Sequence, residues 1–344
     1  MKSILFEVLK FVVNPRIALA VLLSLFAGGL NAQVELGLSA SVSPSTVATG
    51  STFIYTLNYQ VSSFTSNGQN VVATLNLPQN LVPASTSPFS NSVEFDPSQV
   101  SGVTYNSGQN SITVTFVNPI PAGSTGQLQI RFRYLNGSTP NGYAPDLFAS
   151  IDADNNLNPG GGTGPVLSNI LNVTATASNQ HNISKTKLAG GAIDNLTIYR
   201  INVSGSSPSN GSLITYQPVL VDTLPLGVEF VEATGFSGST APVYNALTRT
   251  VTWTWLADSF RTNYSSSAYI SVRYTSPTFA VSDNVCNKIN LFGESPALPI
   301  GSRAAFGKSA QACFSIQSPS PGVSCYGGGI TAATAHWMNK HILP

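Results

Sequence analysis

Charged residues are scarce in this chain of 344 residues: Asp, Glu, Lys and Arg make up 8%, and the formal net charge is +1. Nucleic-acid binding and electrostatic membrane binding both need clustered Lys and Arg, so neither partner is expected. The low charge does not indicate disorder, because 42% of the residues are hydrophobic and they include 17 Phe and 12 Tyr, which favour strands.

Histidine is also scarce, with three residues in all. His181, His336 and His341 stand in no sequence context typical of a catalytic triad. Cys325 together with the last two histidines has no recognised zinc spacing. We therefore expect a protein that is not an enzyme.

Long apolar runs are missing except for one, from Ile17 to Leu30. It follows a basic segment and ends in small residues, which predicts a secretory signal peptide over residues 1–32. Cleavage would leave Gln33 first, and this residue can cyclise to pyroglutamate. The run is shorter than the ~20 residues of a membrane span. The prediction is a secreted, extracellular or cell-surface protein with no membrane span after cleavage.

Strand patterns dominate the rest of the chain. Alternating apolar and polar residues occupy 53–59, 111–116 and 127–134, and Gly, Pro and Asn clusters separate them. Short strands at regular spacing with turn residues between them are typical of antiparallel sandwiches. The predicted fold class is all-β.

An internal repeat divides the strands into two modules. We predict two tandem immunoglobulin-like sandwiches at 33–178 and 179–307, and a tail or truncated next repeat at 308–344. The matched blocks, in chain order, are 54–59 with 198–203, 77–82 with 224–230, 105–116 with 244–255, 131–134 with 271–274, and 169–172 with 287–290.

The second module resembles a known family through four segments: 183–187, 221–231, 244–255 and 284–287. The run Asp-Thr-Leu-Pro-Leu-Gly-Val-Glu-Phe-Val from Asp222 is the most distinctive. These segments resemble the conserved-repeat domain of bacterial surface proteins, also catalogued as domain of unknown function eleven. The resemblance implies immunoglobulin-like sandwiches with structural or adhesive roles and no known catalysis.

One candidate site is an intramolecular isopeptide bond, which some surface-adhesin sandwiches form between a first-strand Lys and a last-strand Asn beside a buried acid. The roles would fall to Lys185 or Lys187, Asn287 or Asn290, and Asp222. Attack on the amide needs a neutral, buried Lys and a protonated carboxyl. The alternative is a solvated Lys185 and an Asp222 that only fixes a turn. The first module has Leu75 in place of the acid and no first-strand Lys, so no bond is expected there.

A second candidate site is a calcium loop, because Asp152, Asp154, Asn156 and Asn158 place oxygen-bearing side chains at alternate positions. The segment lacks the Gly at position six and the Glu at position twelve of an EF-hand loop. The pattern therefore favours a polar turn before the glycine-rich stretch 160–164. Calcium remains the one candidate cofactor.

The three cysteines favour one disulfide in an exported protein. Cys286 and Cys313 are the preferred pair, with Cys325 left over, and the other two pairings stay open.

Strand aromatics are interpreted as core residues more readily than as a sugar-stacking platform, because both modules carry them at matching positions. They are Tyr105, Phe116, Phe132, Tyr134, Tyr244, Trp253, Trp255 and Tyr274.

The predicted function is a non-enzymatic structural or adhesive surface component, a stalk or fibre. Its expected partners are further copies of itself in a fibre, other surface proteins or glycans. The alternative is a carbohydrate-binding module or an accessory part of a secreted hydrolase system, which exposed aromatics on one face would favour.

Overall fold

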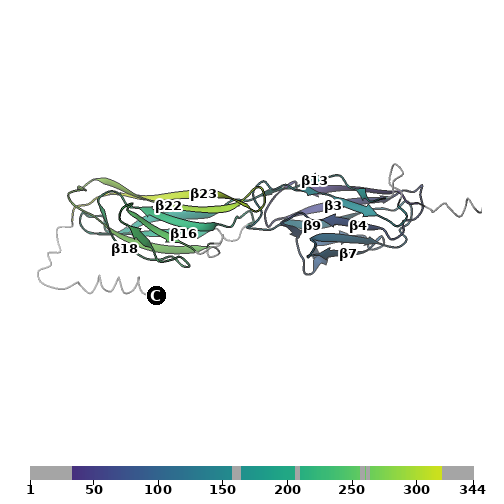
Figure 1. Cartoon of the computed structure of the whole chain (residues 1–344), viewed down its shortest axis with the longest axis horizontal. Helices are drawn as coiled ribbons and strands as arrows, with labels where there is room; N and C mark the ends of the chain where they lie inside the picture. The colour runs from purple at the N-terminus through teal and green to yellow at the C-terminus, as the bar shows by residue number, and fades with distance from the viewer. Residues whose placement is uncertain (1–32, 157–163, 206–209, 256–259, 261–263, 320–344) are drawn as a thin grey trace, which may run out of the picture. The chain divides into compact units, whose positions relative to one another are not determined.

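The computed structural model describes residues 33–156, 164–205, 210–255, 260 and 264–319 (Figure 1). The predicted signal peptide and the end of the chain from residue 320 lie outside these ranges. Antiparallel strands form nearly all of the described secondary structure, which confirms the all-β sandwich class. No helix within the described ranges is long and apolar enough to cross a membrane.

The chain divides into two compact units. One comprises Met1–Gln180, Ser207–Ile214 and Ser295–Ala304, and the other His181–Ser206, Thr215–Glu294 and Ala305–Pro344.

The first unit is built from two larger sheets, in the orders β1-β3-β9-β5 (with β6 also paired to β9) and β12-β11-β4-β8-β7. Short pairs β14-β2 and β10-β13 supplement them, and a 3₁₀ turn, η2, spans Phe89–Ser92. The strands are β1 Leu36–Ser43, β2 Thr46–Ala48, β3 Thr52–Val61, β4 Val72–Asn76, β5 Leu81–Pro83, β6 Val93–Phe95, β7 Val100–Asn106, β8 Ser111–Phe116, β9 Thr125–Tyr134, β10 Asp146–Leu147, β11 Ala149–Asp152, β12 Val166–Leu167, β13 Leu171–Asn172 and β14 Thr174–Thr176.

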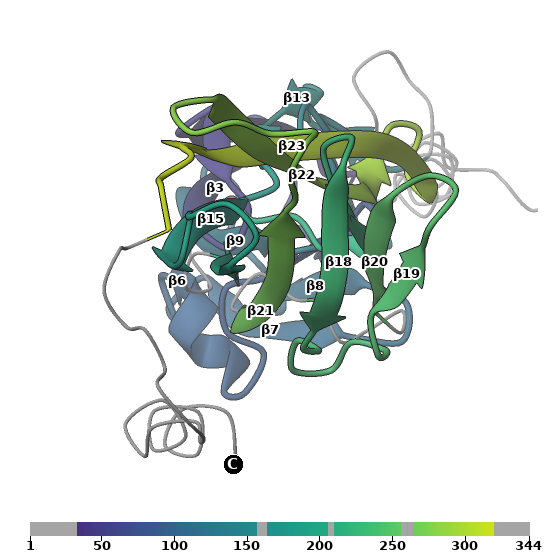
Figure 2. The ribbon, with the colours of Figure 1, turned by 90° about the vertical axis from the view of Figure 1, so that its left-hand side faces the viewer.

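The second unit contains two sheets, in the orders β15-β16-β21-β18 and β19-β20-β17-β22-β23. Figure 2 shows β21 beside β18, with the long strands β22 and β23 crossing above them in that view. The strands are β15 His181–Ala189, β16 Leu196–Gly205, β17 Tyr216–Thr223, β18 Val228–Ala233, β19 Val243–Asn245, β20 Thr250–Thr254, β21 Ser265–Tyr274, β22 Asn284–Ala297 and β23 Ser302–Ser315.

The same strand order recurs in the two units. Position by position, β1, β3, β9 and β5 correspond to β15, β16, β21 and β18, and β12, β11, β4, β8 and β7 correspond to β23, β22, β17, β20 and β19. The pairing registers agree too: Leu75 lies opposite Ile112 in β4-β8, and Asp222 lies opposite Val251 in β17-β20. The first four repeat blocks are therefore equivalent in three dimensions.

The fifth repeat block is a wrong match. Ala149 lies opposite Leu75, whereas Ile289 lies opposite Asp222. The counterpart of Ile289 is thus Ala149, and the counterpart of Asn287 is Leu147, not Asn169. The Asn-x-x-Asn pattern at 169–172 is a weak indicator of equivalence, because the chain is rich in Asn.

Strand alternation places one side of each sheet in a core. In β3 and β16, every second side chain is buried, which follows from the two-residue period of a strand. Each unit has its own cluster of buried apolar residues.

The second unit extends past its predicted end at residue 307. Strand β23 continues to Ser315, and Ala312 and Ile316 belong to the buried core of this unit. Residues 308–315 therefore belong to the last strand of this sandwich and not to a tail, because they lie beside β22 and include the core residue Ala312.

Candidate functional site

A lysine lies in the core of the second unit. Lys185 is in the middle of β15, opposite Ile201 of β16, and only 5% of its surface is exposed. The other candidate, Lys187, lies closer to the end of β15. Its Nζ donates a hydrogen bond of 2.8 Å to the Gly190 carbonyl and lies 4.8 Å from the ring centre of Phe314. The structure therefore places Lys185, not Lys187, in the interior.

The acid and the amide come from two paired strands of the opposite sheet. Asp222 on β17 is fully buried and lies opposite Ile289 of β22. Asn287 precedes Ile289 by two residues, so it is on the same face of β22, and it too is fully buried. Asn290, the alternative amide, lies on the other face.

The buried lysine is paired with the buried acid. Lys185 Nζ and Asp222 Oδ2 form a hydrogen-bonded pair with no exposed side-chain surface on either partner. Burial lowers the pKa of Lys185, an effect that the nearby Asp222 opposes. Burial likewise raises the pKa of Asp222, against the effects of Lys185 and Asn287. In both residues desolvation is the largest effect, so the pair is driven toward a neutral amine and a neutral carboxylic acid.

The Asn287 amide is held in this site without ordinary hydrogen bonds. It acts on the pKa of Asp222, yet neither its Oδ1 nor its Nδ2 has a partner of standard geometry among the described residues. The second carboxyl oxygen of Asp222, Oδ1, also lacks one. A buried polar atom left unpaired costs about 1–3 kcal/mol. Three such atoms lie in this one cluster, and a concentration of unpaired polar atoms in a core requires an explanation.

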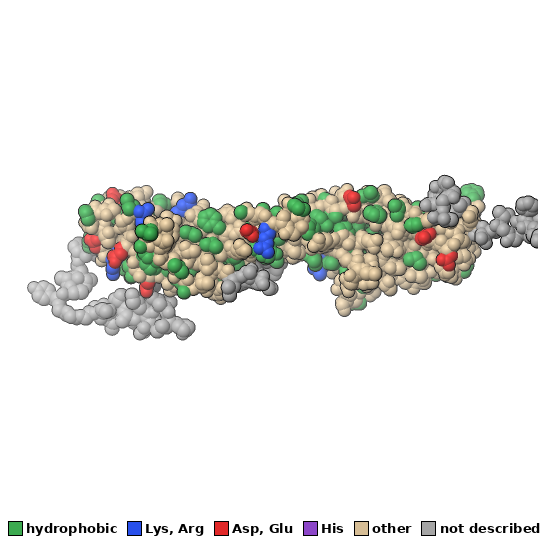
Figure 3. All heavy atoms as spheres, in the orientation of Figure 1, with side chains coloured by type: hydrophobic (Ala, Val, Ile, Leu, Met, Phe, Trp, Pro, Cys, Tyr) green, Lys and Arg blue, Asp and Glu red, His purple; other side chains and the backbone are tan. Residues whose placement is uncertain are grey.

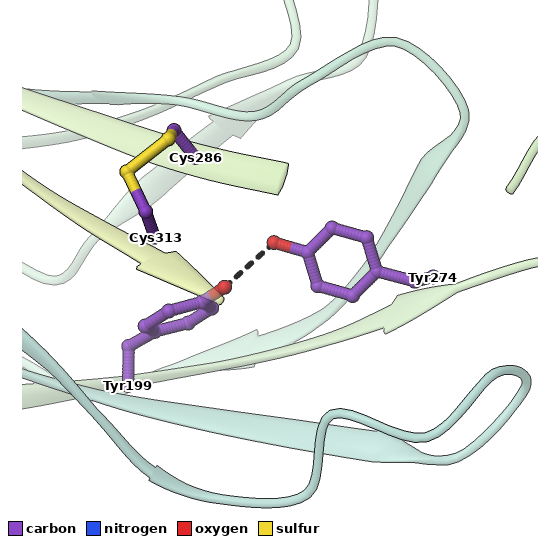
Figure 4. The surroundings of a disulfide bond; sticks show 4 residues. All are labelled: Tyr199, Tyr274, Cys286 and Cys313. Atoms are coloured by element: carbon purple, nitrogen blue, oxygen red, sulfur yellow. Dashed lines mark hydrogen bonds between the residues drawn. A yellow bond between two sulfur atoms is a disulfide. The ribbon is translucent and has the colours of Figure 1, made fainter. Parts of the chain in front are cut away.

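Aromatic side chains line the cluster. Lys185 Nζ lies 4.8 Å from the ring centre of Tyr199. The hydroxyls of Tyr199 and Tyr274 are hydrogen-bonded at 2.6 Å, and Figure 4 shows them pointing toward one another. Burial raises the pKa of Tyr274 to about 12 and raises that of Tyr199 as well. Both phenols therefore stay uncharged at neutral pH and add no anion that would favour a protonated lysine.

A disulfide joins Cys286 to Cys313, as predicted, with a Cα–Cα distance of 4.1 Å (Figure 4). It links β22 to β23 on the exposed side of their sheet, because both cysteines have exposed side chains. Cys286 is the residue directly before Asn287, so successive residues of β22 face outward and inward.

The first unit has apolar residues at all three positions of the cluster. Ala40 lies opposite Leu57 and is the counterpart of Lys185; Leu75 and Leu147 are the counterparts of Asp222 and Asn287. All three are buried. No lysine, acid or amide thus occupies these three positions of the first unit.

The predicted calcium loop is only partly described, because Asn158 lies outside the described residues. Asp152 Oδ1 accepts hydrogen bonds from the Ala153 amide and from Asn156 Nδ2, and Asp154 Oδ2 accepts one from Asn70 Nδ2 at 2.7 Å. The two carboxylates are thus engaged by different amide donors. No group of three or more His, Cys, Asp or Glu suited to a metal occurs among the described residues.

The strand aromatics are mainly core residues. Phe116, Phe132, Tyr134, Trp253, Trp255 and Tyr274 are all at most 5% exposed. The remaining two, Tyr105 and Tyr244, pack against their cores, and Tyr244 stacks on Phe230 with ring centres 4.4 Å apart. These eight side chains do not form an exposed sugar-stacking platform.

No protein-family model and no curated protein sequence matches the chain, so the resemblance to the conserved-repeat family stays a prediction. Among solved structures the chain is similar to the major pilin subunit BcpA of Bacillus cereus, with 11% identity, 82% of this chain and 71% of that chain covered, and a TM-score of 0.34. It is also similar to a C-terminal fragment of the major pilin GBS80 of Streptococcus agalactiae, with 10% identity, coverages of 79% and 90%, and a TM-score of 0.31. A third is the C-terminal domain of the antigen I/II-family protein AspA of Streptococcus pyogenes, with 9% identity, coverages of 81% and 99%, and a TM-score of 0.28. Identities and TM-scores this low do not assign a function.

Proposed function

We propose that the chain is a non-enzymatic structural or adhesive component of a bacterial cell surface, and that its second unit locks itself with an amide bond between Lys185 and Asn287. The observation that carries the proposal is the buried cluster of a lysine, an acid and an unpaired amide. Lys185 belongs to one sheet, and Asp222 and Asn287 to the other. The bond would therefore join the two layers of the sandwich covalently.

The cluster has the groups that the reaction requires. The neutral Nζ of Lys185 attacks Cγ of Asn287, while the protonated carboxyl of Asp222 donates a hydrogen bond to Oδ1 and stabilises the negative charge that develops there. Asp222 then transfers a proton from Nζ to Nδ2, the Cγ–Nδ2 bond breaks, and ammonia leaves. The products are a secondary amide and ammonia, and Asp222 is regenerated. Burial keeps water away from the reacting atoms.

Several features support a surface role. The fold is a duplicated sandwich with dense strand pairing, and its sequence begins with a predicted export signal. Figure 3 shows a face on which charged side chains are few among hydrophobic side chains, other uncharged side chains and backbone. A protein outside the cell is exposed to proteases and mechanical load, and covalent links between strands oppose unfolding by both. Further copies of the chain, other surface proteins and glycans remain the proposed partners.

Intact mass of the purified mature chain, measured with and without reduction, tests the proposal. The amide bond removes one ammonia, about 17 Da, and the loss persists after reduction. Cyclisation of Gln33 removes the same mass, so proteolysis must recover a branched peptide that joins the Lys185 and Asn287 regions. Lys185→Met is the matched variant, which should lose the branched peptide and keep the N-terminal cyclisation. A wild-type digest containing only linear Lys185 and Asn287 peptides would refute the bond.

A further inference from the structure

The proposed amide bond and the disulfide meet at adjacent residues. Asn287 faces the core of the second unit and Cys286 faces outward, on the same strand, β22. The amide would link Asn287 to β15, the first strand of this unit, and the disulfide links Cys286 to β23, the last. A continuous covalent route then runs from Lys185 through Asn287 and Cys286 to Cys313.

The amide bond by itself would leave the last strand unprotected. Strand β23 is at the edge of its sheet, next to β22 only, and Ala312 is its one buried residue. When the unit is pulled by its two ends, the force that enters at β15 leaves through β23. Although Phe306, Ala310 and Phe314 also pack against the core, β23 has a neighbouring strand on one side only, so it would separate from β22 first. The disulfide ties it near its C-terminal end, at Cys313.

We infer that Cys286–Cys313 and the Lys185–Asn287 amide act as two clamps in series, so that the second unit transmits load without unfolding and becomes extensible only when the exposed disulfide is reduced. This inference rests on the proposed function, because it needs the amide. A dithiol reductant supplies two electrons and two protons, the S–S bond becomes two thiols, and the reductant leaves as its own disulfide.

The length released by reduction follows from the positions of the two links. The cysteines are 27 residues apart, and Asn287 is one residue closer to Cys313 than Cys286 is. About 26 residue steps of about 3.3–3.6 Å each give an extension of about 9 nm. Loss of the amide alone would instead free the segment from the start of β15 to Cys286. That segment of about 100 residues corresponds to about 35 nm.

Single-molecule stretching of the full mature chain, held by its two ends, tests the inference. The chain should carry Cys325→Ser, which removes the third thiol and prevents exchange. Without reductant, we expect unfolding of the first unit and no step from the second. With reductant, a new step of about 9 nm should appear. In Lys185→Met without reductant, the second unit should give the step of about 35 nm.

A triple variant provides a second test in case Lys185→Met does not fold. Lys185→Met, Asp222→Leu and Asn287→Leu together give the second unit an apolar cluster like Ala40, Leu75 and Leu147 of the first, and the expected step is again about 35 nm. If the branched peptide is present and reductant adds no 9 nm step, β23 holds without its disulfide and the inference fails while the proposed function stands. If the branched peptide is absent, both fail.

Discussion

Replacing Lys185 with Met should lower the melting temperature of the second unit substantially. The amide between Lys185 and Asn287 would close a loop of about 100 residues, and chain entropy gives such a cross-link about 4.7 kcal/mol of stabilisation. Unfolding entropy is about 2.1 cal/mol/K per residue, or about 0.27 kcal/mol/K for a unit of about 130 residues. The melting temperature should therefore fall by about 17 °C. Asp222, left without its lysine, adds to the loss in the same direction.

Differential scanning calorimetry of the mature chain gives the measurement, because the transition of the first unit acts as an internal reference. Lys187→Met is the matched control: it removes a lysine from the same strand, but one whose hydrogen bond to Gly190 is at the surface. Its melting temperature should stay within about 4 °C of the wild type, since exposed interactions contribute about 0–1 kcal/mol. Equal melting temperatures for Lys185→Met and wild type would show that no amide bond between Lys185 and Asn287 stabilises this unit.

Three further predictions concern other parts of the chain. Asp222→Asn keeps the shape of the acid but cannot transfer the proton. We therefore expect an intact mass without the ammonia loss from amide formation, and no branched peptide in a digest. A branched peptide at the wild-type yield would remove Asp222 from the mechanism. Gly190→Ala, made in the Lys185→Met background, should destabilise the second unit by more than about 1 kcal/mol in urea unfolding. Gly190 has a φ of +76°, and a Cβ there would lie 2.0 Å from the Leu196 carbonyl oxygen. Gly102→Ala serves as the control, because no atom lies within 4 Å of the added Cβ. Calcium should leave the melting temperature of the first unit unchanged, because Asp152 and Asp154 are engaged by amide donors; a rise that Asp154→Asn abolishes would instead establish a calcium loop.

The sequence was sufficient to identify the fold class and the three residues of the cluster, but not the choice between neighbouring candidates. Lys185 and Lys187 are two residues apart, so strand alternation puts both on the same face. Depth decides between them: Lys185 lies opposite Ile201 in the body of β15, and Lys187 borders a register shift near the end of the strand. Asn287 and Asn290 differ by three residues, so alternation alone separates them once the buried face is known.

Other features needed the pairing of distant strands. The match of Asn169 to Asn287 failed because the strand equivalent to β22 in the first unit, β11, is four residues long and has no asparagine. The hydrogen bond between Tyr199 and Tyr274 joins residues 75 positions apart on the neighbouring strands β16 and β21, where Tyr199 lies opposite Ile270, four residues before Tyr274. The repeat gave a partial signal, since Tyr55 and Tyr134 occupy the matching positions in the first unit.

The apolar cluster of Ala40, Leu75 and Leu147 has a consequence for how such units diverge after duplication. Two sandwiches with the same strand order hold polar residues in one case and apolar residues in the other at the same three positions, so inheritance of the fold does not require inheritance of the cluster. Gain and loss of such a cluster also require different numbers of substitutions. A lone lysine or carboxylate placed in an apolar core leaves a buried charge unpaired, which costs several kcal/mol, so a new cluster must acquire its residues nearly together. Loss can begin with one change at the asparagine, which leaves the remaining pair neutral and the sandwich folded.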